Sequence, residues 1–437
     1  MNKFKCGCLA SLLLCGCSMF DKAPLDIEGE RVSVVRESSN LKPDYAIGQS
    51  KIKLPRAQKN YSWTQRGATS EHIVGHLKAG GNLDELWQIS FGEGSSKRNV
   101  LISSPVVLGR QVFTIDAEGI VRSFNLENGD ELWKKRLKHK NKETREASIL
   151  GGGIAASQGM IFATTGFGKV FALETMSGNI IWENDVKSPI RISPTINEDL
   201  LLIQTLDNAI YALNTKSGKI LWKDKIEEES TTMVGGASPA YSIANDLVVA
   251  AFSNGQLQAY KASTGTPLWS EWLVSGNITD SLSDITSVKA NPVIDKEMVF
   301  AVGYNTPLMA IDIRTGVKLW QKEIASAHQP WVAGRFLFVL TTDNDLVALD
   351  KTNGKIVWTT IIPLEDESRI GIFTSGPILA NDALLVASSD GKLYSVSPYN
   401  GRIMGVADID EGVETSPILA NETLILTTKY ADMTAYK

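Results

Sequence analysis

Short apolar runs alternate with turn residues along the chain from about residue 82 onward. The pattern is clearest in SPTINEDLLLIQTLDNAIYALNTKSGKILWKDKI (193–226), where stretches rich in Asp, Asn and Gly separate four apolar runs. Runs of this length, bounded by such turn residues, are typical of short strands in an antiparallel meander. Each unit of this kind therefore predicts one four-stranded β-sheet.

The unit recurs along the chain, and the two ends of the pattern complement each other. Matching units begin near residues 104, 153, 238, 291, 329, 376 and 416, and the last one stops before its fourth strand. The segment LDELWQISF (83–91) has the features of a fourth strand but follows no first three. A closed ring, completed by this N-terminal strand, accounts for both ends. The sequence predicts an all-β, eight-bladed β-propeller over residues 82–437, since an open solenoid would need capping repeats that are not visible.

A glycine stands four residues before a tryptophan in most units, as in GNIIW (178–182) and GKILW (218–222). The glycine falls in the turn before the outermost strand, where we expect a positive φ. The tryptophan falls in the middle of that strand, where a large ring can fill the seam between adjacent blades. We interpret these tryptophans as architecture and not as a ligand site. The seventh unit has Gly405 at the Trp position, so one seam should lack its ring.

The N-terminus carries the features of a secretory signal. Two lysines precede the apolar run LASLLL, which is shorter than the roughly 20 residues that span a bilayer. The run ends in LCGC (14–17), which resembles the lipobox of bacterial lipoproteins. That resemblance implies a signal peptide over residues 1–16 and a lipid on Cys17, the only cysteine left after cleavage. The alternative is an ordinary signal peptide with incidental cysteines.

Residues 17–81 differ from the rest of the chain, because they are polar, interrupted by prolines and without periodicity. We interpret them as a lipidated tether that reaches from the membrane, as is expected at a lipidated N-terminus. Tyr61 and Trp63 are the positions at which part of this tether can lie on the domain. Ser18, after the lipidated cysteine, implies the outer membrane under the enterobacterial sorting rule for lipoproteins.

The composition excludes some classes of function. Hydrophobic residues make up 43% of the chain and charged residues 21%, as in ordinary globular proteins. The net charge is -5 and the basic residues are scattered, so nothing indicates a nucleic-acid partner.

The repeat units resemble a known family. AIDIRTGVKLW (310–320) and ALDKTNGKIVW (348–358) are similar to the PQQ-type propeller repeat. This repeat occurs in quinoprotein alcohol dehydrogenases, which bind pyrroloquinoline quinone and calcium. It also occurs in the BamB lipoproteins of the outer-membrane β-barrel assembly machinery, which bind BamA and have no cofactor.

The chemistry of the residues separates these two settings. Quinoprotein dehydrogenases share a vicinal Cys–Cys disulfide, an Asp base and a calcium site of carboxylate and amide oxygens. The mature chain has no Cys pair, and its only closely spaced histidines, His72 and His76, lie in the predicted tether. We therefore expect no catalysis, cofactor or metal, with a periplasmic PQQ-dependent dehydrogenase as the alternative.

Two predicted interblade loops carry the resemblance to BamB further. DSLSDITS (280–287) is similar to an acidic BamB loop that contacts a periplasmic domain of BamA, and Asp280 and Asp284 match its Asp residues. The second loop, ESTTMVGGASP (229–239), has Thr231, Met233 and Val234 where BamB has leucines and an arginine that face BamA. Met can replace an apolar anchor, but the arginine is lost. Both loops join an outermost strand to the innermost strand of the next blade, so we expect them on the same face of the propeller. The alternative for Asp280 and Asp284 is an acidic loop that is exposed to solvent and binds no partner.

The resemblance thus implies an outer-membrane lipoprotein at the periplasmic face. Its expected partners are the periplasmic domains of BamA, outer-membrane protein substrates, and the membrane through the lipid.

Overall fold

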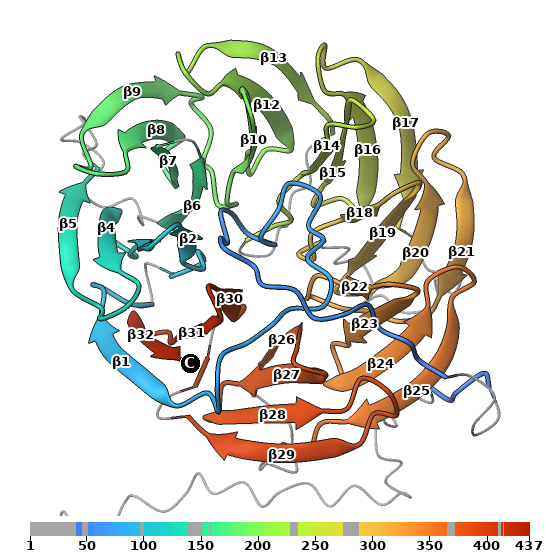
Figure 1. Cartoon of the computed structure of the whole chain (residues 1–437). Helices are drawn as coiled ribbons and strands as arrows, with labels where there is room; N and C mark the ends of the chain where they lie inside the picture. Colours follow the sequence, from blue (N-terminus) through green and yellow to red (C-terminus); the bar gives the residue numbers. More distant parts are fainter. Residues whose placement is uncertain are drawn as a thin grey trace, which may run out of the picture. The chain divides into compact units, whose positions relative to one another are not determined.

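The computed structural model describes residues 41–45, 51–96, 100–137, 151–157, 159–227, 235–273, 288–364, 372–409, 412–413 and 415–437. Across these residues 32 strands form eight four-stranded antiparallel sheets. Figure 1 shows the sheets arranged as blades around a central axis, with colour advancing around the ring. We number the blades 1–8 in chain order. Within each blade, the strands are given from the innermost to the outermost.

The first four blades are formed by strands of three to seven residues. Their bounds are β2 Val106–Leu108, β3 Gln111–Ile115, β4 Ile120–Asn125 and β5 Glu131–Arg136 in blade 1; β6 Gly151–Ser157, β7 Met160–Thr165, β8 Lys169–Glu174 and β9 Ile180–Asp185 in blade 2; β10 Thr195–Asn197, β11 Leu200–Gln204, β12 Ala209–Asn214 and β13 Ile220–Lys225 in blade 3; β14 Ala240–Ser242, β15 Leu247–Ala251, β16 Gln256–Lys261 and β17 Pro267–Trp272 in blade 4.

The other four blades repeat this order. Their bounds are β18 Val293–Asp295, β19 Met298–Gly303, β20 Thr306–Asp312 and β21 Lys318–Lys322 in blade 5; β22 Trp331–Ala333, β23 Phe336–Leu340, β24 Asp345–Asp350 and β25 Lys355–Ile361 in blade 6; β26 Thr374–Ala380, β27 Ala383–Ser388, β28 Lys392–Val396 and β29 Ile403–Asp408 in blade 7; β30 Ile418–Ala420, β31 Thr423–Thr427, β32 Asp432–Tyr436 and β1 Glu85–Ser90 in blade 8.

Blade 8 closes the ring as predicted. Its outermost strand is β1, from the N-terminal side of the chain, and it pairs antiparallel with β32 from Glu85↔Tyr436 to Ser90↔Asp432. The two ends of the propeller are thus held together by main-chain hydrogen bonds. The predicted eight-bladed all-β fold is confirmed.

The blades pack through apolar seams. The second strands are almost wholly buried and the third strands largely so, except β28, and their aliphatic and aromatic side chains form clusters that span neighbouring blades. Outermost strands alternate between exposed and partly buried residues, as in the pattern of β13.

Tryptophans fill seven of the seams, and each one donates from Nε1 to a main-chain carbonyl of the following blade. The donors and acceptors are Trp87 and Leu126, Trp133 and Thr175, Trp182 and Thr215, Trp222 and Ala262, Trp269 and Ile313, Trp320 and Lys351, and Trp358 and Pro398, at 2.7–3.0 Å. The prediction that these rings are architectural is confirmed. In blade 7 the position is Gly405, around which an added Cβ would meet nothing within 4 Å.

Residues 51–80, which we call the strap, are not a free tether. The strap runs across the inner strands near the axis, as the blue trace in Figure 1 shows. Trp63 is buried and stacks on Trp331 with ring centroids 6.5 Å apart, whereas Tyr61 is 67% exposed. Part of the predicted tether over residues 17–81 thus lies on the propeller, through Trp63 as expected and not through the side chain of Tyr61.

The strap gives one hydrogen-bond contact to the inner strand, or the turn after it, of each blade in turn. The pairs are Asn60 with Asn421 after β30, Trp63 with Val107 of β2, Thr64 with Ala156 of β6, Gln65 with Ile196 of β10, Ser70 with Tyr241 of β14, Glu71 with Ile294 of β18, Gly75 with Trp331 of β22, and Leu77 with Leu379 of β26. An innermost strand is a sheet edge with unpaired main-chain groups, and the strap bonds to main-chain groups at every edge but that of blade 6, where Trp331 donates from its indole Nε1. Contacts of this kind need no apolar periodicity, which is why the sequence pattern did not reveal them.

Candidate partner-binding face

The residues predicted to contact a partner lie outside the described residues. This holds for Thr231, Met233 and Val234 in the first loop, for Asp280 and Asp284 in the second, and for Cys17 at the N-terminus. The structure does describe where each loop leaves and re-enters the propeller. It therefore tests the predicted placement of the loops but not their contacts.

The two loops connect neighbouring blades in the same way. The first leads from β13 of blade 3 to β14 of blade 4, and the second leads from β17 of blade 4 to β18 of blade 5. Each one joins an outermost strand to the next innermost strand, as predicted. Their returning ends, residues 235–239 and 288–292, lie at the axis at the start of adjacent inner strands; we call them the loop roots.

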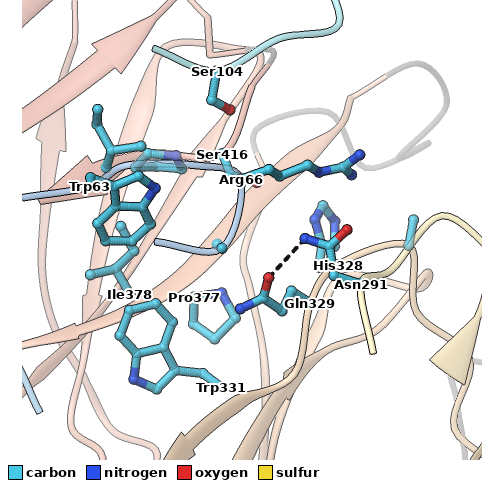
Figure 2. A pocket seen from close by; sticks show the side chains of 15 residues that line it. Trp63, Arg66, Ser104, Asn291, His328, Gln329, Trp331, Pro377, Ile378 and Ser416 are labelled. Atoms are coloured by element: carbon cyan, nitrogen blue, oxygen red, sulfur yellow. Dashed lines mark hydrogen bonds between the residues drawn. The ribbon is translucent and has the colours of Figure 1, made fainter. Parts of the chain in front are cut away.

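The loop roots are joined to each other directly. The main-chain N–H of Ser238, in the first root, donates to Oδ1 of Asn291 in the second root at 2.8 Å. Both residues are buried. Asn291 in turn donates from Nδ2 to Oε1 of Gln329 at 3.0 Å, which extends the link to blade 6 (Figure 2).

Arg66 of the strap makes a second connection between the loop roots. Its Nη1 donates to the carbonyl oxygen of Gly236 at 2.7 Å, and its Nη2 donates to that of Lys289 at 3.3 Å. One guanidinium thus holds main-chain atoms of both roots at a fixed spacing. No sequence pattern marked this role, because Arg66 lies in a segment without periodicity.

A small cavity of about 50 Å³ lies on the axis beside these roots. Its lining includes Trp63 and Arg66 from the strap, Asn291 and His328 from blades 5 and 6, and Ile378 from blade 7 (Figure 2). One side is apolar, and the other carries the guanidinium, imidazole and amide groups. The strap therefore forms part of the wall of the central channel.

The histidines that the sequence singled out have structural roles. His72 is buried, and its Nδ1 lies 2.7 Å from the carbonyl oxygen of Pro292. Burial lowers the pKa of His72 to about 4, so its ring is neutral at pH 7. In His76, Nδ1 lies 2.8 Å from the carbonyl oxygen of Pro55, and Nε2 accepts from the N–H of Asp382 at 3.0 Å.

The described residues contain no group of three or more His, Cys, Asp or Glu side chains placed to hold a metal ion. Nor, within these residues, is any helix long and apolar enough to cross a membrane.

These features define a class of protein: a closed eight-bladed propeller of PQQ-type repeats with two interblade loops rooted side by side at its axis. The family described as "Outer membrane protein assembly factor BamB" matches residues 117–360, which is more than half of the chain. The chain belongs to the BamB family.

Individual relatives agree. The BamB proteins of Escherichia coli K12 and of Shigella dysenteriae serotype 1 are each 28% identical over 352 residues, covering 80% of this chain and 87% of theirs. BamB of Kangiella koreensis is 25% identical over 388 residues, covering 84% of this chain and 95% of its own.

Solved structures show the same fold. The crystal structure of BamB from Moraxella catarrhalis superposes with a TM-score of 0.69 at 19% identity, covering 81% of this chain and 99% of that one. A quinohemoprotein alcohol dehydrogenase from Comamonas testosteroni superposes with a TM-score of 0.65 at 11% identity, covering 87% of this chain and 80% of that one. At such identities the likeness concerns the fold alone.

Proposed function

We propose that this chain is a non-catalytic assembly factor for outer-membrane proteins. In this proposal it is anchored by a lipid on Cys17 to the periplasmic face of the outer membrane and assists the insertion of β-barrel proteins. Membership of the BamB family, whose members are named as outer-membrane protein assembly factors, is the observation that carries it.

The proposed partner is BamA, bound through Thr231, Met233, Val234, Asp280 and Asp284 on the two loops. The geometry of the loop roots supports this, because Ser238–Asn291 and Arg66 hold both roots beside one another. A single partner domain then reaches an apolar and an acidic segment together. Apolar anchors supply most of the affinity of such interfaces, and charges supply orientation and steering.

Dehydrogenase activity is the other candidate that the repeat allows. Its support is the fold shared with quinohemoprotein dehydrogenases, and a shared fold does not carry an activity. The four cysteines all lie within residues 1–17, so the propeller sequence has no Cys pair of the kind those enzymes carry. We therefore favour the assembly factor.

The test is affinity purification of the tagged full-length protein from detergent-solubilised envelopes of the source bacterium. We expect BamA to co-purify, and a Cys17→Ser variant should leave the membrane fraction. Reduction of an artificial electron acceptor by the purified protein with alcohols and added quinone would contradict the proposal, as would the absence of BamA from a stable preparation.

A further inference from the structure

Basic side chains gather at the axial end of the loop roots. Arg66 extends from the strap toward Asn291 and His328 (Figure 2), and its guanidinium binds the carbonyl oxygens of Gly236 and Lys289. Lys289 stands two residues before Asn291, and the same repeat position is occupied by Arg191 in blade 3 and by Gly236 in blade 4. The Arg66 guanidinium therefore binds the main chain at two of these three equivalent positions, one of which, Gly236, lacks a side chain.

These cations have no carboxylate partner among the described residues. Burial lowers the pKa of Arg66 to about 10 and also lowers that of Lys289, on which the charge of Arg66 acts in the same direction. Arg66, with a pKa of about 10, remains protonated at neutral pH. The Nε of Arg191 is likewise buried without a hydrogen-bond partner there.

Three other cations of low exposure among the described residues are paired. Arg122, 13% exposed, lies 2.7 Å from Asp116, and Lys169, 11% exposed, lies 3.4 Å from Glu183. Lys351, 15% exposed, is paired with Asp295. Partly desolvated charges normally require such a counter-charge, since unpaired burial is unfavourable. Within the described part of the chain, the axial cluster differs from these three pairs.

The donors left over at the axis suit an oxyanion. The Arg66 guanidinium has five N–H groups, and its bonds to the described residues are those to Gly236 and Lys289. The ammonium of Lys289 has three donors and bonds to no described side chain. His328 adds an imidazole whose pKa burial and the charges of Arg66 and Lys289 lower to about 4, so the ring is neutral at pH 7. Carboxylate and phosphate oxygens are the acceptors that such donors bind best.

We propose that Arg66 and Lys289, with the His328 ring beside them, form a binding site for one oxyanion in the axial channel. The ligand is a single carboxylate or phosphate group, carried by a dissolved anion or by an acidic side chain of a docked polypeptide. The adjacent cavity of about 50 Å³ admits a group of that size and no large organic ligand. This site does not depend on the proposed function.

The experiment follows the ³¹P resonance of inorganic phosphate during titration with the full-length protein in detergent. The ionic strength is held constant with sodium chloride at every phosphate concentration. Weak non-specific attraction of the anion is then the same for wild type and each variant. We expect saturable line broadening, and at least about a tenfold weaker affinity for both Lys289→Gln and Arg66→Gln. Lys289→Gln removes no described side-chain bond, so it tests the site even if Arg66→Gln perturbs the strap.

The matched control is Lys216→Gln, because Lys216 is 68% exposed and pairs with Asp199 on the rim. Phosphate binding should be unchanged in this variant. A second arm replaces phosphate with N-acetylglutamate methylamide, observed through its side-chain methylene resonances. Tighter binding of the glutamate derivative identifies an acidic polypeptide as the source, and tighter binding of phosphate identifies a dissolved or headgroup phosphate.

Three results would overturn the proposal. One is that neither anion binds saturably. Another is that binding is equal in wild type, Lys289→Gln and Lys216→Gln, which would mean adventitious surface attraction. The third is that phosphate binds only after Asp280→Asn and Asp284→Asn are introduced, because the chain's own carboxylates would then occupy the site.

Discussion

Trp269 of blade 4 packs its indole ring directly against Gly316 of blade 5. A Cβ added at Gly316 would lie 2.7 Å from Cγ of Trp269, and φ at Gly316 is +73°. The same relationship recurs at each of the seven tryptophan seams described above, so each glycine serves two purposes. It takes up the left-handed turn, and it leaves room for the ring of the preceding blade.

Gly316→Ala should therefore lower the free energy of unfolding by more than the backbone strain of the turn alone would. The left-handed conformation costs about 1–2 kcal/mol with a Cβ, and the contact with Trp269 adds to it. Trp269→Ala should cost about 3–5 kcal/mol, as for other buried aromatic rings. Urea denaturation of the single and double variants measures both effects. The double variant should lose less than the sum, because the clash disappears with the ring.

Gly405→Ala is the matched control for this seam. An added Cβ at Gly405 meets no atom within 4 Å, and its φ is not in the left-handed region. The free energy of unfolding should change by no more than about 0.5 kcal/mol. A loss at Gly405 equal to that at Gly316 would show that the tryptophan contact is not the cause.

Ring closure by β1 predicts a specific effect of truncation. We expect a chain from which residues 82–92 are deleted to melt far below the intact chain, because only the deletion exposes the edge of β32. The difference should exceed the roughly 2–4 °C that a defect of 1 kcal/mol causes in a large domain. Calorimetry of the two chains makes the comparison. Equal melting temperatures would mean that β1 adds nothing to the ring.

His72 predicts a pH dependence of stability. Its pKa is about 4 in the folded protein and about 6.5 in the unfolded chain, so the unfolded chain binds the extra proton between these values. The contribution of neutral His72 to the free energy of unfolding is complete above pH 6.5 and is lost as the pH falls toward 4. With a ring that is 1% exposed, the loss is on the order of 3 kcal/mol.

His72→Asn isolates this effect from the titration of carboxylates. The Asn amide can donate to the carbonyl of Pro292, as Nδ1 of His72 does, but it does not titrate. The free energy of unfolding, measured from pH 7.5 to 4, should fall more steeply for wild type than for His72→Asn, by on the order of 3 kcal/mol over this range. Parallel curves would show that His72 is not the group responsible.

The fold could be predicted from sequence because the same unit is repeated eight times, and the pattern of one unit supports that of the next. The incomplete last unit and the isolated strand at 83–91 then fixed the closure. The strap was missed because its contacts, such as Ser70 with Tyr241 and Glu71 with Ile294, use main-chain groups. Any residue can supply a carbonyl, so no residue type marks them.

The axial cations were missed for a related reason. Arg66 and Lys289 are far apart in the sequence, and only the path of the strap brings them together. The residues proposed to contact BamA present the opposite case. Resemblance alone indicated Met233 and Asp280, and the structure describes the roots of their loops without the loops themselves.

The proposed lipid anchor depends on one atom, the Sγ of Cys17. Cys17→Ser should abolish metabolic labelling with palmitate and release the protein from membranes, because no other cysteine follows the predicted cleavage site. The control is Cys15→Ser, which keeps a small residue within the lipobox and should label normally. Label retained in Cys17→Ser would place the lipid elsewhere.

The proposed interface predicts that two changes on the loops weaken BamA binding together. Met233→Asp places a charge on the apolar anchor, and Asp280→Arg reverses a charge that steers the partner. We expect the double variant to bind the periplasmic domains of BamA at least about 2 kcal/mol more weakly, with an unchanged melting temperature. Isothermal titration calorimetry gives the affinity.

Met176→Asp with Asp199→Arg is the control. Both residues are exposed on turns far from the loop roots in sequence, so these changes should leave binding intact. If the double variant binds as wild type does, the interface lies elsewhere on the propeller; if wild type does not bind, the partner itself is wrongly assigned.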